Sequence, residues 1–227
     1  MSRNRFAPFE FALVIGIAFG WPILGSVLDL LYGKTVGEAG ARQAFTDSYL
    51  YGVVMSELIA FPVIVALLHF RGWRPQDFPL GISPAATALG AAMFAAAWIV
   101  DWIANATLVQ LFSTLGPALE TLSAYRPTEP PSLVAIYLVS VINPVFEEVI
   151  VCGYVIPAIA GRFGQTAAIN TSVIIRVSYH LYQGVAALPF HALYGLMQAY
   201  LYARFGRLWP LIVSHALLDF VALMLLV

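Results

Sequence analysis

Charged residues are scarce in this 227-residue chain, which has 11 Lys and Arg, 12 Asp and Glu, and a charged fraction of only 10%. Soluble domains are about 25% charged and about 45–50% apolar, whereas 61% of this chain is hydrophobic. The net charge of −1 leaves no basic stripe of the kind that nucleic-acid binding requires. We therefore expect an all-α, polytopic membrane protein in contact with the lipid bilayer, and no nucleic-acid partner.

Cysteine is almost absent as well. The single Cys152 excludes an internal disulfide, so cysteine usage says nothing about the redox compartment. Internal repeats and low-complexity segments are also missing from the sequence. The N-terminal Arg3 and Arg5 precede an apolar run that continues to Tyr32 without a small-residue cleavage site, which predicts a retained first span rather than a signal peptide.

Long apolar stretches with short connections predict one membrane domain, residues 1–227, with about seven transmembrane helices. The expected spans are 9–32, 49–70, 84–112, 132–157, 166–183, 188–202 and 208–227. The third would exceed the roughly 30 Å hydrocarbon core, so we expect it to tilt, protrude or break; its first half is rich in Ala and Gly, which suits close helix contact. Eight helices are the alternative to seven, and for the short sixth span the alternative is that the stretch around residues 184–189 re-enters the membrane instead.

The distribution of cations predicts the orientation. With seven spans and the N-terminus inside, the inner side carries most of the Lys and Arg, as the positive-inside rule requires. The inner cations would be Arg3, Arg5, Arg71, Arg74, Arg162, Arg204 and Arg207, and the outer ones Lys34, Arg42 and Arg126. The N-terminus is therefore predicted to be cytoplasmic.

Two adjacent carboxylates, Glu147 and Glu148, interrupt the fourth expected span. Each charge at mid-membrane costs roughly 2.5–3.5 kcal/mol on insertion scales, and such groups face the protein interior and pair. Three expected helices carry polar pairs spaced i and i+4, so the members of each pair lie on one helix face. The pairs are Asn143 with Glu147, Arg176 with His180, and His215 with Asp219. We expect them to converge in a polar, water-accessible chamber.

Other polar residues in the spans have simpler interpretations. Glu57 and Asp101, in the second and third spans, have no role that the sequence alone assigns. His191 has no polar partner at helical spacing and is interpreted as a packing or interfacial residue.

The polar motifs resemble those of the CPBP family of intramembrane proteases, which includes CAAX prenyl endopeptidases, bacteriocin-processing enzymes and Abi proteins. The family's motifs are EExxxR, FxxxH and HxxxN or HxxxD, in that order. Here they read Glu147-Glu148-x-x-x-Cys152, Arg176-x-x-x-His180 and His215-x-x-x-Asp219. The resemblance covers about residues 132–220 and implies a catalytic core, residues 132–227, in the last four helices.

Two positions depart from the family pattern. Cys152 stands where the family has arginine, and Arg176 stands where it has phenylalanine. An unpaired buried charge is strongly destabilising. We therefore expect that the cation has moved, and that Arg176 neutralises Glu148 from a neighbouring helix.

The resemblance implies an endopeptidase that hydrolyses a peptide bond at or within the membrane. Glu147 would be the general base that activates a water, and His180 would hold that water or move a proton. His215 with Asp219 would stabilise the oxyanion or position the substrate, while Glu148, Arg176 and Asn143 support the site. The substrate would be a peptide or protein, and lipidated peptides are among those that the family cleaves.

Three alternatives remain open from the sequence. Glu147, His180, His215 and Asp219 are acceptable zinc ligands, although the chain has no HExxH or HxxEH; we favour a glutamate-activated water that needs no cofactor over a bound zinc ion. Outside protease chemistry, the alternatives are a proton-coupled transporter and a non-catalytic scaffold or immunity protein of the same fold.

Overall fold

The computed structural model of the protein describes residues 6–32, 45–115, 129–183 and 187–227, and every regular element in these ranges is helical. The α-helices are α1 (Pro8–Tyr32), α3 (Asp47–Phe70), α4 (Pro84–Leu115), α5 (Leu133–Glu147), α6 (Val155–Phe163), α7 (Gln165–Tyr179), α8 (Leu188–Phe205) and α9 (Trp209–Met224). A π-helix, η3 (Glu148–Tyr154), joins α5 to α6, and the 3₁₀ turns η1 (Pro75–Asp77) and η4 (Leu181–Gln183) precede α4 and α8. The all-α prediction is confirmed.

In the described ranges, four helical stretches are long and apolar enough to cross a membrane, and the chain is an integral membrane protein. They are Pro8–Leu28, Asp47–Phe70, Pro84–Ile103 and Leu133–Phe163, and Trp209–Met224 is a shorter apolar helix. Seven or eight spans and a cytoplasmic N-terminus stay predictions. Part of the predicted re-entrant segment, together with the outer cations Lys34, Arg42 and Arg126, lies outside the described residues.

The fourth expected span is longer than predicted. The helical run from α5 continues through η3 and α6 to Phe163, and Gly164, with φ +85°, ends it. The helical run passes through Pro157, which lies in the first turn of α6 directly after the π-turn of η3. The predicted end at Pro157 is therefore wrong.

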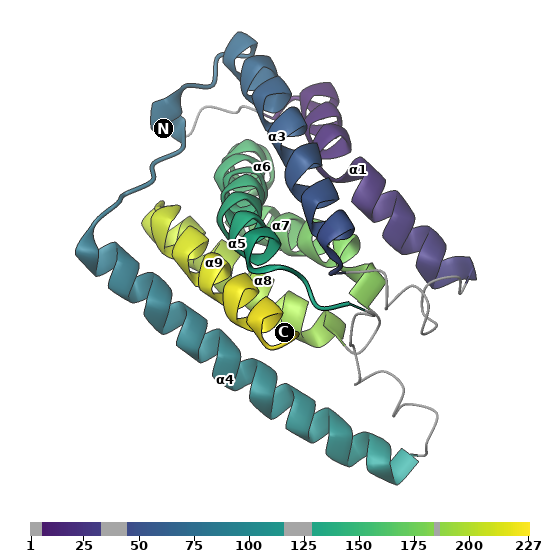
Figure 1. The fold of residues 1–227 in the computed structure, drawn as a ribbon. Helices are drawn as coiled ribbons and strands as arrows, with labels where there is room; N and C mark the ends of the chain where they lie inside the picture. Colours follow the sequence, from purple (N-terminus) through teal and green to yellow (C-terminus); the bar gives the residue numbers. More distant parts are fainter. Residues whose placement is uncertain (1–5, 33–44, 116–128, 184–186) are drawn as a thin grey trace.

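The helices form a group around the α5–η3–α6 run (Figure 1). Helices α1 and α3 lie on one side of it, and α4 runs beside α9 on the other. A Cβ at Gly90 of α4 would lie 2.7 Å from the carbonyl oxygen of Pro210 and 2.7 Å from Cβ of Val213. The small-residue face predicted on this span therefore does make a close contact, with α9.

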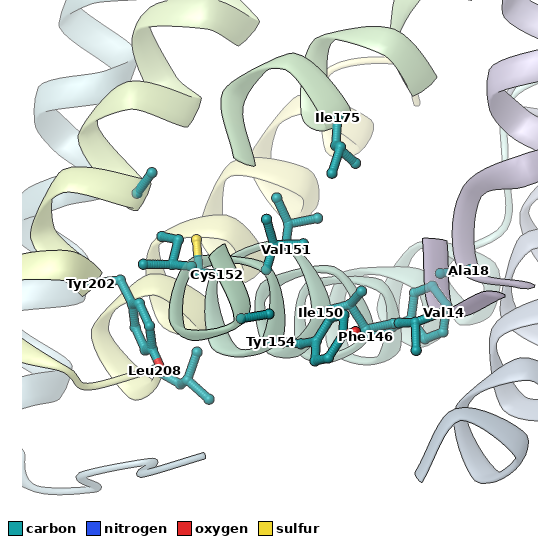
Figure 2. Close-up of a cluster of buried hydrophobic side chains, with 14 of the residues drawn as sticks. Val14, Ala18, Phe146, Ile150, Val151, Cys152, Tyr154, Ile175, Tyr202 and Leu208 are labelled. Atoms are coloured by element: carbon teal, nitrogen blue, oxygen red, sulfur yellow. The ribbon is translucent and has the colours of Figure 1, made fainter. Parts of the chain in front are cut away.

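The π-helix is the best-buried part of the chain. Ile150, Val151 and Cys152 are fully buried, and Figure 2 shows the surrounding cluster of apolar side chains, including Val14 of α1 and Tyr202 of α8. Helices α1, α7 and α8 thus pack onto the turn that follows the two glutamates.

The irregular backbone of η3 also anchors α7. A π-turn interrupts the regular i→i−4 bonding of a helix, and such turns are frequent at functional sites. The hydroxyl of Ser172 donates to the carbonyl of Val151 at 2.8 Å, and both groups are buried. Because Arg176 lies four residues after Ser172 on the same face of α7, this bond aims Arg176 at the start of η3.

A second buried carboxylate ties α1 to this core. The side chain of Glu10 accepts hydrogen bonds from Arg71 Nε at 2.9 Å, Trp73 Nε1 at 3.1 Å and Tyr154 Oη at 3.1 Å. One cation and two neutral donors therefore satisfy Glu10, which joins the N-terminal helix to the end of α3 and to η3.

Candidate active site

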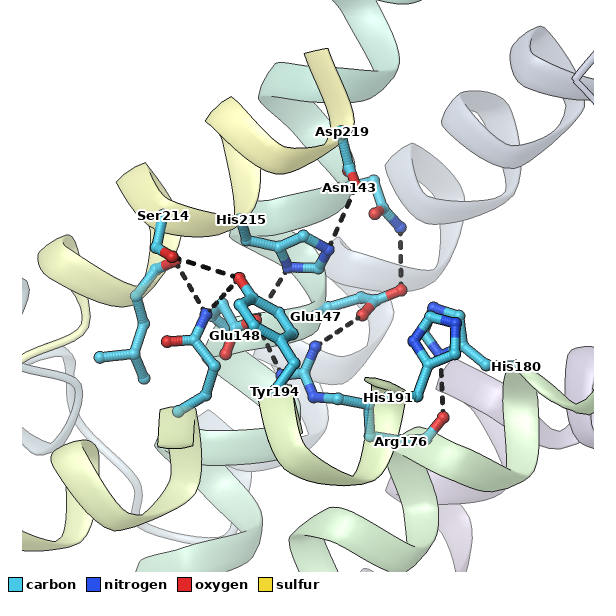
Figure 3. Close-up of polar contacts among 12 residues, drawn as sticks. Asn143, Glu147, Glu148, Arg176, His180, His191, Tyr194, Ser214, His215 and Asp219 are labelled. Carbon is cyan, nitrogen blue, oxygen red and sulfur yellow. Dashed lines mark hydrogen bonds and ion pairs between the residues drawn. The ribbon is translucent and has the colours of Figure 1, made fainter. Parts of the chain in front are cut away.

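The centre of the polar network is a forked contact between Arg176 and both adjacent glutamates (Figure 3). Its Nη2 lies 2.7 Å from Oε1 of Glu148, and its Nη1 lies 3.3 Å from Oε2 of Glu147. The Arg176 side chain is 2% exposed and that of Glu148 is fully buried. The ion pair expected between Arg176 and Glu148 is therefore present, across two helices.

The guanidinium fits here because α8 leaves space for its stem. A Cβ at Gly195 would lie 3.0 Å from Cδ of Arg176, closer than ordinary side-chain packing. The ring of Tyr194 lies 5.9 Å from the guanidinium carbon, within the range of a cation–π contact.

The two carboxylate oxygens of Glu148 have different surroundings. His215 Nδ1 lies 2.8 Å from the same Oε1 that Arg176 contacts. On its other side, His215 Nε2 lies 3.5 Å from Oδ1 of Asp219. Oε2 of Glu148 is buried and has no hydrogen-bond partner among the described residues. Glu148, the first residue of η3, thus joins η3 to α7 and α9, and it holds the His215 ring in place.

Glu147 is held by three donors. Its Oε2 accepts from Tyr179 Oη at 2.5 Å and from Arg176, and its Oε1 accepts from Asn143 Nδ2 at 3.1 Å. A carboxylate oxygen has two acceptor positions. Among the described residues, Oε2 is therefore filled, whereas Oε1 keeps one position open. Sequence reasoning missed Tyr179, because an aromatic residue in an apolar span is more often a packing residue.

His180 lies beside this network without joining a carboxylate. Its Nδ1 is 2.8 Å from the backbone carbonyl of Arg176, which can only accept, so Nδ1 carries a hydrogen. Nε2 of a neutral ring is then the free acceptor. Within the described ranges, no carboxylate lies within ion-pair distance of His180. The structure therefore brings His180 close to Arg176, and it unites the other six predicted site residues in one bonded network.

His191 is not the isolated packing residue that the sequence suggested. Its Nε2 lies 2.7 Å from Oε1 of Gln183, and its ring stacks on His180 with 4.0 Å between centroids and 23° between planes. Its burial and stacking agree with a packing role, but the sequence argument missed the polar partner because it searched only helical spacing, whereas Gln183 lies in η4, before α8 begins.

Comparison with protein-family models assigns this part of the chain. Residues 129–221 match the model described as type II CAAX prenyl endopeptidase Rce1-like. The chain carries an Rce1-like domain. This domain includes all three motifs from which the resemblance was drawn, and it covers less than half of the chain, leaving out α1, α3 and α4. Searches of curated proteins and of solved structures found no match.

The side chains of the Rce1-like domain are not arranged as a metal centre. Within the part of the chain that the structure describes, no three His, Cys, Asp or Glu side chains form a group that could hold a metal ion. Of the four ligands considered, His215 contacts Asp219, but His180 faces a carbonyl and His191 instead. The arrangement of these side chains, in the part of the chain that the structure describes, thus does not fit a bound zinc ion.

Three site residues are not fully buried: Asp219, whose side chain is 24% exposed, and the partly buried Asn143 and His180. A separate pocket of about 330 Å³ lies between α4, α8 and α9, and none of the site residues lines it. Its lining is Ala85, Ala86, Leu89, Met93, Leu201, Phe205, Arg207, Pro210 and Leu211. The water-accessible chamber predicted at the glutamates stays a prediction.

Proposed function

We propose that the protein is an intramembrane endopeptidase that hydrolyses a peptide bond in a lipidated substrate, with Glu147 as the general base. The Rce1-like domain supports an intramembrane protease of the CAAX type. A prenylated C-terminal peptide is the substrate class that the family description names. The transporter and the non-catalytic scaffold gain no support from the match.

The observation that carries the mechanism is the difference between the two adjacent glutamates. Glu148 is fully buried and bound to Arg176 and His215, so its role is to hold these two side chains in place. Glu147 is bound at Oε2 but keeps an acceptor position on Oε1. A general base must be oriented and must still reach a water proton, and of the two glutamates Glu147 fits this requirement better.

In the proposed reaction, a water bound at Oε1 of Glu147 loses a proton to that oxygen while its own oxygen attacks the carbonyl carbon of the scissile bond. The attacked carbonyl becomes an oxyanion. Collapse of the tetrahedral intermediate breaks the C–N bond, and the proton held by Glu147 passes to the leaving amine. The products are a carboxylic acid and an amine.

The two histidines have separate roles in this proposal. His180 has its Nε2 free, so it accepts a hydrogen bond from the attacking water and orients it. His215 lies between the carboxylates of Glu148 and Asp219, so in this proposal its ring is the imidazolium, with a hydrogen on both nitrogens. Its Nε2 lies 3.5 Å from Asp219, too long for a strong hydrogen bond, and therefore donates to the oxyanion. A preorganised donor of this kind is worth roughly 10²–10³ in kcat.

The test is cleavage of a farnesylated C-terminal peptide, and of the same peptide without the lipid, by the full chain in proteoliposomes. Glu147→Gln should lower kcat by about 10²–10⁴-fold, because the base is lost while the size of the side chain is kept. Glu10→Gln is the matched control, since it changes a buried carboxylate outside the network, and its kcat should be unchanged. Full activity of Glu147→Gln would refute the general-base assignment.

A further inference from the structure

A polar contact reaches the site from outside the Rce1-like domain. Glu57 lies on α3, which precedes residues 129–221, and only 6% of the residue is exposed. Its Oε1 accepts a hydrogen bond from Asn143 Nδ2 at 2.7 Å. The same amide nitrogen donates to Oε1 of Glu147 at 3.1 Å. One NH₂ group therefore bridges two carboxylates that lie on different helices.

The comparison with Glu10 shows that Glu57 is poorly explained as a structural residue. Glu10 is equally buried, but a cation and two neutral donors satisfy it. Among the residues that the structure describes, Glu57 forms no ion pair, and its Oε2 is buried without a hydrogen-bond partner. Burying a carboxyl group with so little compensation is costly. Positions that break such rules are expected at functional sites.

The bridge also determines how the Asn143 amide is oriented. An amide has one donor end and one acceptor end. Carboxylates on both sides require the NH₂ group between them, because the amide oxygen would face a second acceptor. Without the Glu57 acceptor, only one of the two N–H groups would keep its partner, and the amide would be freer to rotate.

The atom affected by this orientation is the one that the proposed mechanism uses. Asn143 occupies one acceptor position of Glu147 Oε1, and the open position on that same oxygen is where the water would bind. The direction of the open position is set by where Asn143 donates. A displacement of about 1 Å at a reacting group can cost about 10²-fold in rate.

We propose that Glu57 is a positioning residue of the protease site, which acts through the Asn143 amide to orient the catalytic oxygen of Glu147. This inference rests on the proposed function. It gives a role in positioning the site to α3, which lies outside the segment that matches the family model.

The decisive comparison is between Glu57→Leu and Glu57→Gln in proteoliposomes with the farnesylated peptide. Leucine removes the acceptor, so kcat should fall by about 10–100-fold while KM changes less than about twofold. Glutamine keeps an amide oxygen that can accept from Asn143, so its kcat should stay within about threefold of wild type. Equal losses in both variants would overturn the proposal, because the charge and not the acceptor would then matter.

A double-mutant cycle covers the case in which Glu57→Leu folds poorly. Asn143→Leu removes the bridge from the other side, and it should lower kcat to a similar extent. If Glu57 acts only through Asn143, the variant with both changes should be no slower than Asn143→Leu alone. If the kcat losses of the two single variants multiply in the double variant, the proposal is overturned. If Glu57→Leu keeps full kcat while Glu147→Gln is inactive, this inference is overturned and the proposed function stands. If Glu147→Gln is active, the proposed mechanism itself is refuted.

Discussion

Arg176 reaches Glu148 from a different helix, with 2.7 Å between Nη2 and Oε1, and both side chains are almost completely buried. In the family pattern that the sequence resembles, the arginine stands four residues after the glutamates, where this chain has Cys152. Arg176 thus supplies the cation beside the glutamates, although it belongs to the second motif and not to the motif that contains the glutamates. Charge compensation at this site is therefore a property of the folded bundle and not of one motif.

The first prediction concerns moving the arginine from position 176 to position 152, where the family pattern has it. Arg176→Phe should destabilise the protein by about 3–5 kcal/mol, because both glutamates lose their buried cation. Adding Cys152→Arg restores the family pattern and should recover a large part of the stability and activity. Thermal unfolding in detergent and the proteoliposome assay measure the two effects.

The exchange also has a clear negative outcome. If the double variant is as unstable and inactive as Arg176→Phe alone, the cation at position 176 is not equivalent to the family arginine. Cys152→Arg by itself serves as the control, and it should be unfavourable because it adds a second cation to a site that is already compensated.

The second prediction concerns the space for Arg176. Gly195→Ala would place a methyl group 3.0 Å from Arg176 Cδ, and the guanidinium beyond it is fixed by two carboxylates. Overpacking of this kind costs about 1–3 kcal/mol, so both the unfolding temperature and kcat should fall. Gly20→Ala on α1 is the matched control, because no atom lies within 4 Å of its Cβ. That variant should be as stable as wild type or slightly more stable.

The sequence predicted the parts of the site that depend on helical spacing. His215 and Asp219 face one another because they are four residues apart on one helix, and the twin glutamates stood out because charge is rare in an apolar span. The same argument singled out Glu57 without finding its partner. Contacts between α3 and α5 depend on how two helices are packed side by side, and no periodicity within one helix shows that.

Local irregularities explain most of what was missed. The π-turn at η3 replaces part of the expected single α-helix, and its carbonyl of Val151 is bound by Ser172 from another helix. A turn that is stabilised by tertiary contacts leaves no strong local pattern. The same reasoning applies to His191, whose partners are Gln183 in η4 and the ring of His180 at the end of α7.

The third prediction concerns metal. Because the four candidate ligands do not form a group around one point, we expect purified protein to contain well below one zinc ion per chain. Incubation with a chelator should leave the proteoliposome activity unchanged. Stoichiometric metal by elemental analysis, together with loss of activity on chelation and recovery on adding zinc, would contradict this prediction and require the site to rearrange around the ion.

The fourth prediction separates the ring of His191 from its hydrogen bond. If stacking on His180 is what holds the proposed water-binding ring, His191→Phe should keep most of the activity, because an aromatic face is retained. His191→Ala should lower kcat, since an aromatic pair contributes about 0.5–1.5 kcal/mol beyond its buried area and the freed His180 ring can rotate. Gln183→Leu removes the hydrogen bond to His191, together with the donation from Gln183 Nε2 to Tyr182 Oη at 3.1 Å, and tests whether the Gln183 side chain orients the pair. The contrary outcome is an equal loss of activity in His191→Phe, His191→Ala and Gln183→Leu. In that case the imidazole of His191 and its bond to Gln183 would be required, and stacking on His180 alone would not explain the role of His191.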